Sequence, residues 1–550
     1  IEALAPNLFH KLEQSHEASP LPGKLIRRDT SWANDEGDVM RKATIFFLLS
    51  FLAISGCSIN PVTGDREFII MSTAQEIELG KQNYAPMQQS QGGVYDVDPE
   101  LTAYVQRVGQ SVASQSGVNL PYDFVVLNNS VPNAWALPGG KIAINRGLLT
   151  ELESEAELAA VLGHEAVHAA ARHTAQQQTR AMLLQVGVMG TAIAASDSDY
   201  SGLIVGGANV LAQAGLARYG RKAELESDAY GMQYMSKAGY DPTGAVDLQE
   251  TFVRLSEGRR TDWLSGLFAS HPPSQERVRA NMATAASLPG GGKRGEREYQ
   301  AAMRKTIAAK PAYEAYDEGR KALAEQNMDL ALAKASEALR LFPNEAHFHA
   351  LRGDIRLVQD NLDWAVTNYN RAIQRRENFF YYHLQRGLAK KELGQVDAAT
   401  ADLEHSIELL PTAPAHYALG DIARARGNLP AAIQHYKVVA QAGGEYGQAA
   451  SGELARLELP QNPGAYINRA CSADGNGNLI VSVRNETTLQ VQGIQVSVQY
   501  ADSAGRQQQR RFNINGQVPP GQVASVNTGM GPYTAGSGCP AQVVAAEVAE

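Results

Sequence analysis

A repeat in the second half of the chain constrains the fold more than any other feature. Four glycines recur 34, 34 and 33 residues apart, namely Gly319, Gly353, Gly387 and Gly420. An alanine follows each of them by twelve residues, at Ala331, Ala365, Ala399 and Ala432. Small residues at such fixed offsets allow two antiparallel helices to pack closely. Residues 311–445 are therefore predicted to form an α-solenoid of four helix pairs.

The composition sets limits on the rest of the chain. With 550 residues, 44% apolar and 19% charged, it is predicted to be an ordered protein of about three domains. The net charge of −9, without a long basic run, argues against nucleic acid as a partner. The three cysteines form no CxxC pair, so a zinc knuckle or a thioredoxin-like site is not expected.

The N-terminal region resembles a targeting segment. Two basic residues after Met40 precede the apolar stretch Ile45–Ile54, and small residues lead to Cys57. The end of this stretch resembles a bacterial lipobox, so 40–56 is predicted to be a lipoprotein signal peptide and Cys57 the lipidated residue. Residues 1–39 are then a non-native or disordered extension before the biological start. The alternative is a short buried helix with an incidental cysteine. Ser58 is typical of sorting to the outer membrane.

A short motif in an Ala- and Leu-rich run predicts metal chemistry. The run begins near Glu151 and contains few helix breakers, so it is predicted to be a helix. His164 and His168 would lie one turn apart on one face, where both imidazoles can bind one metal ion. Glu165 would stand beside that ion, where a carboxylate can take a proton from water. This H-E-x-x-H arrangement is the zinc-hydrolase signature. The alternative is a helix whose two histidines are only packed or solvated.

Local patterns around the motif predict its neighbours. A helix is expected to begin after Ser72, with Glu76 assisting the cap, and another at Asp98. Residues 122–127 read as a strand, and 133–144 as a hairpin turning at Pro-Gly-Gly. An edge strand at this place could hold an extended peptide by strand addition.

Four ordered blocks resemble the M48 family of zinc metalloproteases. They are Asn60–Gly64, Asn133–Gly147, His164–His173 and Glu224–Gly231. The resemblance implies that residues 57–300 form a mainly α, zincin-type metalloprotease domain with a small β-sheet. It also implies one Zn²⁺ per chain and hydrolysis of peptide bonds, with Glu165 as general base.

The resemblance also implies the remaining site residues. Glu224 is the expected third metal ligand, with Asp228 orienting a histidine of the first helix; Glu226 is the rival ligand. Glu224 and Asp228 share a helical face that Glu226 does not. The alternative for Glu224 is a solvated charge. His173 falls off the metal face and is expected to be structural or to support a ligand.

Two features of this region stay open. His271 opens a segment that resembles the H-P-x-x-x-x-R segment of the family. It could be a fourth ligand, a transition-state donor or a loop residue before two prolines. The apolar stretch 181–216 is predicted to be a helical pair or lid near the cleft, or a membrane-surface or re-entrant segment.

The last two parts of the chain predict binding rather than chemistry. The repeat period is that of the tetratricopeptide repeat, whose concave surfaces bind peptides or proteins, although the array could only extend the scaffold. The aromatic run 379–382 contains partner-binding candidates, or helix–helix core. Residues 462–550 contain four alternating segments and are predicted to form a small antiparallel β-sandwich, closed by a disulfide between Cys471 and Cys539.

These parts together predict a zinc endopeptidase of the bacterial envelope. Lipid at Cys57 would anchor it, in the outer membrane and facing the periplasm. Its substrates would be misfolded or incompletely assembled envelope proteins, recruited by the repeats or by outer-membrane assembly machinery bound to them. The alternative is a chaperone or scaffold for outer-membrane protein assembly in which proteolysis is latent.

Overall fold

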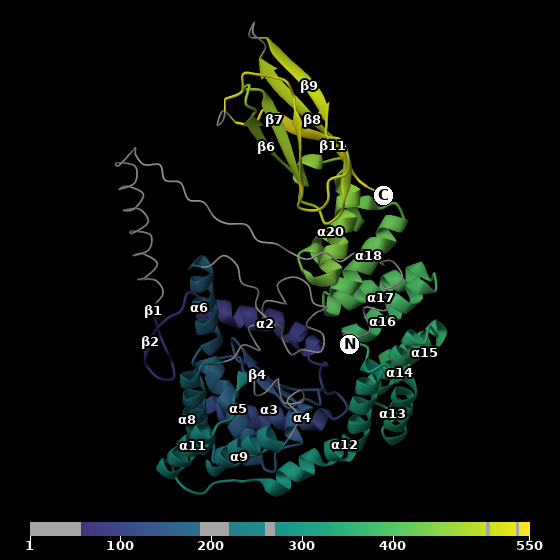
Figure 1. Cartoon of the computed structure of the whole chain (residues 1–550). Helices are drawn as coiled ribbons and strands as arrows, with labels where there is room; N and C mark the ends of the chain where they lie inside the picture. The colour runs from purple at the N-terminus through teal and green to yellow at the C-terminus, as the bar shows by residue number, and fades with distance from the viewer. Residues whose placement is uncertain (1–56, 188–218, 259–269, 502–505, 535–537, 550) are drawn as a thin grey trace, which may run out of the picture. The chain divides into compact units, whose positions relative to one another are not determined.

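The computed structural model describes residues 57–187, 219–258, 270–501, 506–534 and 538–549 (Figure 1). Within these ranges, residues up to Phe379 form one compact unit and residues from Phe380 onward form a second. The predicted extension 1–39, the predicted signal peptide 40–56 and most of the apolar stretch 181–216 lie outside the described residues. None of the helices described is both long and apolar enough to cross a bilayer.

The first unit is mostly helical. Its elements in chain order are β1 (Cys57–Ile59), β2 (Arg66–Phe68), α2 (Thr73–Ser90), α3 (Pro99–Ala113), η2 (Ser114–Ser116), β3 (Asp123–Leu127), β4 (Ala134–Leu137), β5 (Lys141–Asn145), α4 (Arg146–Leu149), α5 (Glu155–Ala170), α6 (His173–Gly187), α8 (Arg221–Lys237), α9 (Thr243–Gly258), α11 (Gln275–Ser287), α12 (Glu296–Ala324), α13 (Met328–Leu341), α14 (Ala346–Val358) and α15 (Leu362–Arg375).

A three-stranded sheet precedes the long central helix. Its order is β3-β5-β4, with β3 parallel and β4 antiparallel to β5. The predicted hairpin is confirmed, because β4 and β5 are joined by a turn in which Gly139 and Gly140 both have positive φ. β4 lies at one edge of this sheet, and its side chains are buried.

The first long helix begins where the sequence predicts, but with a different cap. Ser72 caps α2, and the residue that completes the capping box is Gln75. The expectation that Glu76 assists the cap is wrong. Its carboxylate instead accepts from Arg172 Nε at 2.7 Å, because this side chain points into the protein.

Helices α5 and α8 cross at two glycines. A Cβ on Gly231 would lie 2.9 Å from the backbone nitrogen of His164 and 3.0 Å from the carbonyl carbon of Gly163. Gly163 is equally confined, since its Cβ would lie 3.0 Å from the carbonyl oxygen of Gly231. Only glycine allows the two backbones to approach this closely. The crossing sets the separation between the side chains that the two helices carry.

The first helix of the repeat array, α12, begins before residue 311, the predicted start of the array. α12 runs without a break from Glu296 to Ala324 through Pro311, so the predicted interval between residues 300 and 311 lies inside a helix. Met303 before the proline and Tyr313 after it are both buried in the core of the first unit, and packing on both sides holds the helix together across the proline.

The repeat glycines make close helix contacts. A Cβ on Gly353 would come within 2.7 Å of the ring of Tyr369, and one on Gly420 within 2.7 Å of the ring of Tyr436. The four alanines of the repeat are fully buried. The prediction that small residues bring paired helices together is therefore confirmed. The aromatic residues 379–382 are buried as well, which supports their interpretation as core.

The second unit combines helices with two small sheets. Its elements are α16 (Phe380–Glu392), α17 (Val396–Leu409), α18 (Ala413–Ala425), α19 (Leu429–Ala440), α20 (Gly444–Glu458), η4 (Pro463–Ala465), β6 (Ile467–Ala473), β7 (Leu479–Asn485), β8 (Val491–Ala501), β9 (Gln507–Asn513), β10 (Val523–Asn527) and β11 (Ala541–Val548).

The two sheets are antiparallel and each has three strands. Their orders are β10-β7-β6 and β11-β8-β9, and apolar residues of both sheets share one buried cluster. The four predicted strands correspond to β7, β8, β9 and β10. β6 and β11 were not predicted, because β6 carries few buried apolar residues and β11 is rich in alanine, a weak strand former. A disulfide joins Cys471 to Cys539.

We expect Gly231→Ala to destabilise the first unit. The added methyl group would press on the α5 backbone at His164, and such overpacking costs about 1–3 kcal/mol of unfolding free energy. Chemical denaturation of the full chain measures this cost. Gly452→Ala in α20 is the matched control, because its Cβ would meet only the Leu489 side chain at 3.6 Å. Equal stability of the two variants would contradict the close crossing.

Candidate metal centre

The metal-binding motif lies on a helix that is buried on every side. Ser154 caps α5, with its hydroxyl oxygen accepting the Glu157 backbone N–H at 3.2 Å. Every residue of α5 is buried, as expected of a helix without a polar face. His164 and His168 project from one face of this rigid element, and Glu165 lies beside them.

Two further segments bring carboxylates and a third histidine to α5. Glu224 lies in the first turn of α8, and Asp228 follows one turn later on the same face. His271 lies shortly before α11. All three side chains are buried, with exposed fractions of 2%, 7% and 3%. His164, His168, Glu224 and His271 each offer an atom that can bind a metal, and these atoms lie within 4.8 Å of one another.

The distances between these atoms are close to those of a metal coordination shell. His164 Nε2 lies 3.0 Å from His168 Nε2, 3.2 Å from His271 Nδ1 and 3.6 Å from Glu224 Oε2. Glu224 Oε1 lies 3.4 Å from His168 Nε2 and 3.1 Å from His271 Nδ1. Ligands of a tetrahedral zinc ion, at about 2.0–2.1 Å from the metal, lie roughly 3.3 Å from each other.

The hydrogen bonds of the two α5 histidines favour a cation between them. His164 Nδ1 donates to Asp228 Oδ1 at 2.9 Å, so in a neutral ring Nε2 carries a lone pair. His168 uses Nδ1 for His173 at 2.9 Å and likewise directs Nε2 towards His164. Two lone pairs 3.0 Å apart repel unless a proton or a cation lies between them. The donor set therefore fits zinc, which prefers imidazole nitrogen and carboxylate oxygen.

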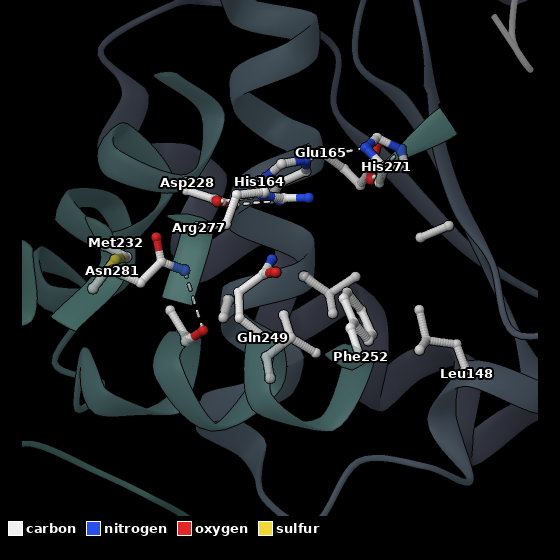
Figure 2. Close-up of a pocket in the computed structure, with 15 residues that line it drawn as sticks. Leu148, His164, Glu165, Asp228, Met232, Gln249, Phe252, His271, Arg277 and Asn281 are labelled. Atoms are coloured by element: carbon white, nitrogen blue, oxygen red, sulfur yellow. Dashed lines mark hydrogen bonds and ion pairs between the residues drawn. The ribbon is translucent and has the colours of Figure 1, made fainter. Parts of the chain in front are cut away.

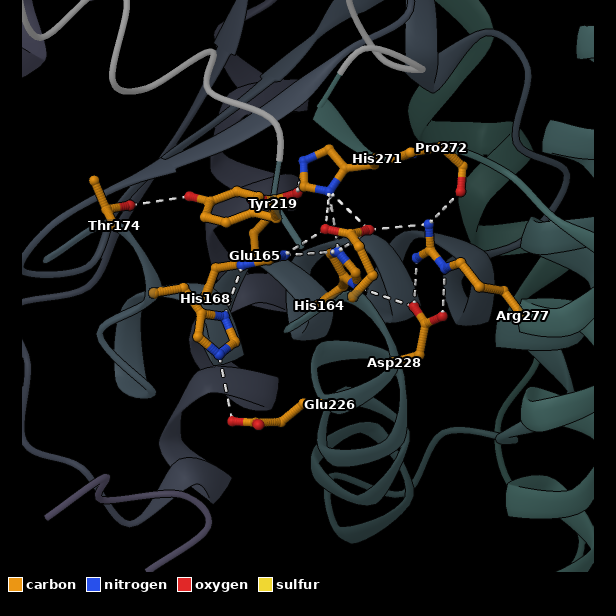
Figure 3. Close-up of polar contacts among 12 residues, drawn as sticks. His164, Glu165, His168, Thr174, Tyr219, Glu226, Asp228, His271, Pro272 and Arg277 are labelled. Atoms are coloured by element: carbon orange, nitrogen blue, oxygen red, sulfur yellow. Dashed lines mark hydrogen bonds and ion pairs between the residues drawn. The ribbon is translucent and has the colours of Figure 1, made fainter. Parts of the chain in front are cut away.

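The neighbouring side chains keep the carboxylates of Glu224 and Asp228 ionised. Burial alone would raise the pKa of Glu224, but the neighbouring His271, His168 and His164 rings lower it far below its usual range. Burial likewise opposes ionisation of Asp228, and the guanidinium of Arg277 lowers its pKa. Arg277 donates to both Asp228 oxygens at 2.7 Å and lies 3.0 Å from Glu224 Oε2 (Figure 3).

Glu165 lies in a different environment from these two carboxylates. Its Oε2 is buried and has no hydrogen-bond partner among the described residues, while Oε1 lies 3.5 Å from His271 Nε2. Burial raises the pKa of Glu165, which makes its carboxylate a better proton acceptor. Desolvation is also the main reason why the pKa of His168 is well below its usual value, which favours the neutral, metal-binding form.

The other residues singled out in the sequence lie away from the cluster. Glu226 accepts from His173 Nε2 at 3.3 Å, and in Figure 3 it lies apart from Asp228 and Arg277. Cys57 begins β1. No role was predicted for Arg277, although it ends the H-P-x-x-x-x-R segment. Tyr219, which stacks on His168 with ring centroids 3.8 Å apart, had no signal in the sequence at all.

A mostly apolar pocket adjoins His164 and Glu165 (Figure 2). Its walls come from α4, α5, α8 and α9 and include Leu148, Val161, Met232 and Phe252. Gln249 also lines it and is 2% exposed, and its Oε1 has no hydrogen-bond partner among the described residues. The site thus combines a polar cluster with an adjoining apolar surface.

Comparison with known families agrees with this geometry. Residues 99–284 match the model of Peptidase family M48, and residues 316–378 and 384–450 match that of the tetratricopeptide repeat. The resemblance to family M48 and the repeat prediction are thereby confirmed.

Curated relatives share part of the chain. A "Beta-barrel assembly-enhancing protease" of Yersinia pestis is 33% identical over 188 residues, covering 33% of this chain and 38% of that protein. A "Mitochondrial metalloendopeptidase OMA1" of Schizosaccharomyces pombe is 34% identical over 225 residues, covering 40% and 64%. The chain thus spans less than two thirds of the length of both relatives.

We expect Asp228→Asn to lower zinc affinity by about 10–100-fold, because loss of such a supporting carboxylate weakens the ligand that it orients. Competition with a chromophoric chelator on the full chain measures the affinity. Asp247→Asn is the matched control, since Asp247 pairs with Arg294 at 2.7 Å on the surface. Unchanged affinity in folded Asp228→Asn would contradict the orienting role.

Proposed function

We propose that this chain, which contains a family M48 metallopeptidase domain followed by tetratricopeptide repeats, is a zinc-dependent endopeptidase of the bacterial envelope. The observation that carries the proposal is the convergence of His164, His168 and Glu224 beside Glu165, one of whose carboxylate oxygens has no hydrogen-bond partner within the described ranges. The three converging residues would hold one Zn²⁺ per chain. Bound zinc supplies a Lewis acid that polarises a peptide carbonyl and makes water more acidic.

The proton transfers fall to Glu165. No described residue hydrogen-bonds to its Oε2, so this oxygen can accept a proton from the water that attacks the peptide carbonyl. The same oxygen then donates this proton to the leaving nitrogen, and the carboxylate is regenerated. Burial raises the pKa of Glu165, which favours its acceptance of the proton from water. Asp228 and Arg277 hold His164 and Glu224 in position throughout.

The substrate would bind next to the sheet. β4 lies at the edge of the order β3-β5-β4, and an extended peptide could pair with its backbone. By analogy with the assembly-enhancing protease, the substrates would be misfolded or incompletely assembled envelope proteins. The repeats would recruit them, directly or through outer-membrane assembly machinery. Lipid on Cys57 would hold the enzyme at the membrane, facing the periplasm. The two small sheets of residues 462–550 would form a sandwich used for binding or packing.

His271 favours a second candidate function. Its Nδ1 lies among the three expected ligand atoms, where a fourth ligand would exclude water. A protein held in this arrangement would act chiefly as a chaperone or scaffold for outer-membrane protein assembly, with latent proteolysis. The two functions differ in whether envelope function requires the proton transfers of Glu165.

We expect Glu165→Gln to lower kcat for cleavage of casein by about 10²–10⁴-fold, because the amide cannot accept the proton from water. Zinc content and thermal unfolding should stay unchanged. Glu153→Gln, an exposed residue just before α5, is the control and should cleave normally. If Glu165→Gln retained full cleavage, the mechanism would be wrong. If it lost cleavage yet fully restored envelope function in cells, the scaffold function would be favoured.

We expect His271→Ala to raise the basal cleavage rate, since removing a fourth ligand frees a position for water. Steady-state kinetics on casein measure this, with the zinc content of the variant determined in parallel. A lower kcat with unchanged KM would instead make His271 a transition-state donor. Unchanged kinetics would leave it as a residue of the loop before α11.

A further inference from the structure

The two histidines of α5 are supported in different ways. Asp228 accepts directly from His164, whereas His168 faces another histidine. His168 Nδ1 lies 2.9 Å from His173 Nδ1, and His173 Nε2 lies 3.3 Å from Glu226 Oε1. His168 and His173 are 1% and 3% exposed. A series of three hydrogen-bonded side chains, two buried and the last partly buried, therefore runs from the expected ligand to the carboxylate of Glu226.

The hydrogen positions along this series follow from Glu226, its last member. A carboxylate oxygen only accepts, so the proton between His173 and Glu226 belongs to His173 Nε2. Neutral His173 then accepts at Nδ1, and His168 must donate from its own Nδ1. This arrangement leaves the lone pair of His168 on Nε2, the atom that faces Glu224 at 3.4 Å. This hydrogen-bonded series thus selects both the tautomer and the direction of the His168 ring.

The β1–β2 hairpin contacts Glu226, the last member of this hydrogen-bonded series. Asn60 is fully buried, and its Nδ2 donates to Glu226 Oε1 at 3.3 Å and to Glu67 Oε1 at 3.2 Å. Its Oδ1 accepts the backbone N–H groups of Val62 and Thr63 at 2.9 and 3.3 Å. One side chain therefore both shapes the turn between β1 and β2 and fixes the carboxylate that supports His173.

A second contact attaches the same hairpin next to His173. Arg172 is 8% exposed and has a φ of 62°, which is unfavourable for a residue with a side chain. Its Nη1 donates to Ser58 Oγ and its Nη2 to the Met71 carbonyl oxygen, both at 2.6 Å. Arg172 therefore attaches β1 and the segment after β2 to the turn between α5 and α6.

We propose that Asn60 of the β1–β2 hairpin, Glu226 and His173 are positioning residues that orient the zinc-binding ring of His168. The inference rests on the proposed zinc site. It assigns the segment directly after Cys57 a role in metal binding that is separate from membrane attachment. Glu226, which the sequence presents as a rival of Glu224 for the metal, acts through His173 instead.

Zinc affinity of the full-length chain tests this role. We expect His173→Phe, which keeps a ring but removes both nitrogens, to lower the affinity by about 10–100-fold. Glu226→Gln keeps an acceptor for His173 but removes the charge, and we expect a smaller loss. Asn60→Asp keeps the acceptor that shapes the turn and removes the Nδ2 donor, and we also expect a loss. Far-UV circular dichroism and thermal unfolding check that each variant is folded.

The Co²⁺-substituted protein provides a readout that a loss of stability alone would not move. A displaced His168 ring should change the visible d–d absorption of bound Co²⁺ in the His173 and Glu226 variants. Asp65→Asn is the matched control. Asp65 lies in the same hairpin and pairs with Lys222 of α8 at 3.4 Å, but it takes no part in the hydrogen-bonded series that supports His168. Its affinity and spectrum should equal those of the unchanged protein.

The outcomes separate this inference from the function on which it rests. If the unchanged chain does not bind zinc, the proposed function fails together with the inference. If it binds zinc, and the folded His173→Phe and Glu226→Gln variants bind with the same affinity and the same Co²⁺ spectrum, only the positioning role is overturned. An equal loss in Asp65→Asn would overturn it as well, because the effect would then belong to the hairpin in general.

Discussion

The close crossing of α5 and α8 is the constraint on which the metal centre depends. Glu224 lies 60 residues from His164 in the chain, yet their donor atoms are 3.6 Å apart. The Glu224 carboxylate can reach His164 only if the backbones of α5 and α8 nearly touch, and Gly163 and Gly231 allow this contact. A larger residue at either position would separate the ligands before it affected any of them chemically. The geometry of the site therefore depends on the two glycines as much as on the histidines.

Charge explains why such a site can be buried. Glu224 and Asp228, whose pKa values are lowered, carry two negative charges, and Arg277 carries one positive charge. Burying uncompensated charge is costly. A divalent cation would offset the remaining negative charge, including that of Glu165 when it is ionised, while the lone pairs of His164 and His168 supply neutral ligands. Arg277 compensates the two carboxylates that must stay ionised and leaves Glu165 for the proton, since its Oε2 has no partner in the part of the chain that the structure describes.

The sequence predicts those parts of the molecule that follow a local rule. Periodic glycines and alanines predicted the helix pairs, and the Pro-Gly-Gly turn predicted the hairpin of β4 and β5. The spacing of His164 and His168 placed both on one helix face, whereas Glu224 came from the family resemblance. Local rules do not show which distant side chains meet. The expectation that Glu76 assists the Ser72 cap of α2 is wrong, because Gln75 holds the capping-box position and Arg172, which is distant in the sequence, binds Glu76. The approach of Arg277 and Tyr219 to the site could not be predicted for the same reason.

The boundary between the two units bears on how the proposed recruitment and the proposed cleavage relate. The unit that holds the metal centre continues through α12 into the first two repeats, and Phe348 of α14 belongs to its core. Polar contacts add to this packing: Tyr299 donates to the Leu149 carbonyl oxygen at 2.6 Å, and Arg376 donates to that of Gly92 at 3.2 Å. Since these repeats share a core with the helices around α5, they cannot move as an independent binding module. A protein bound by them would be held at a fixed place relative to His164 and Glu165, which reduces the entropy lost when a segment of it enters the site.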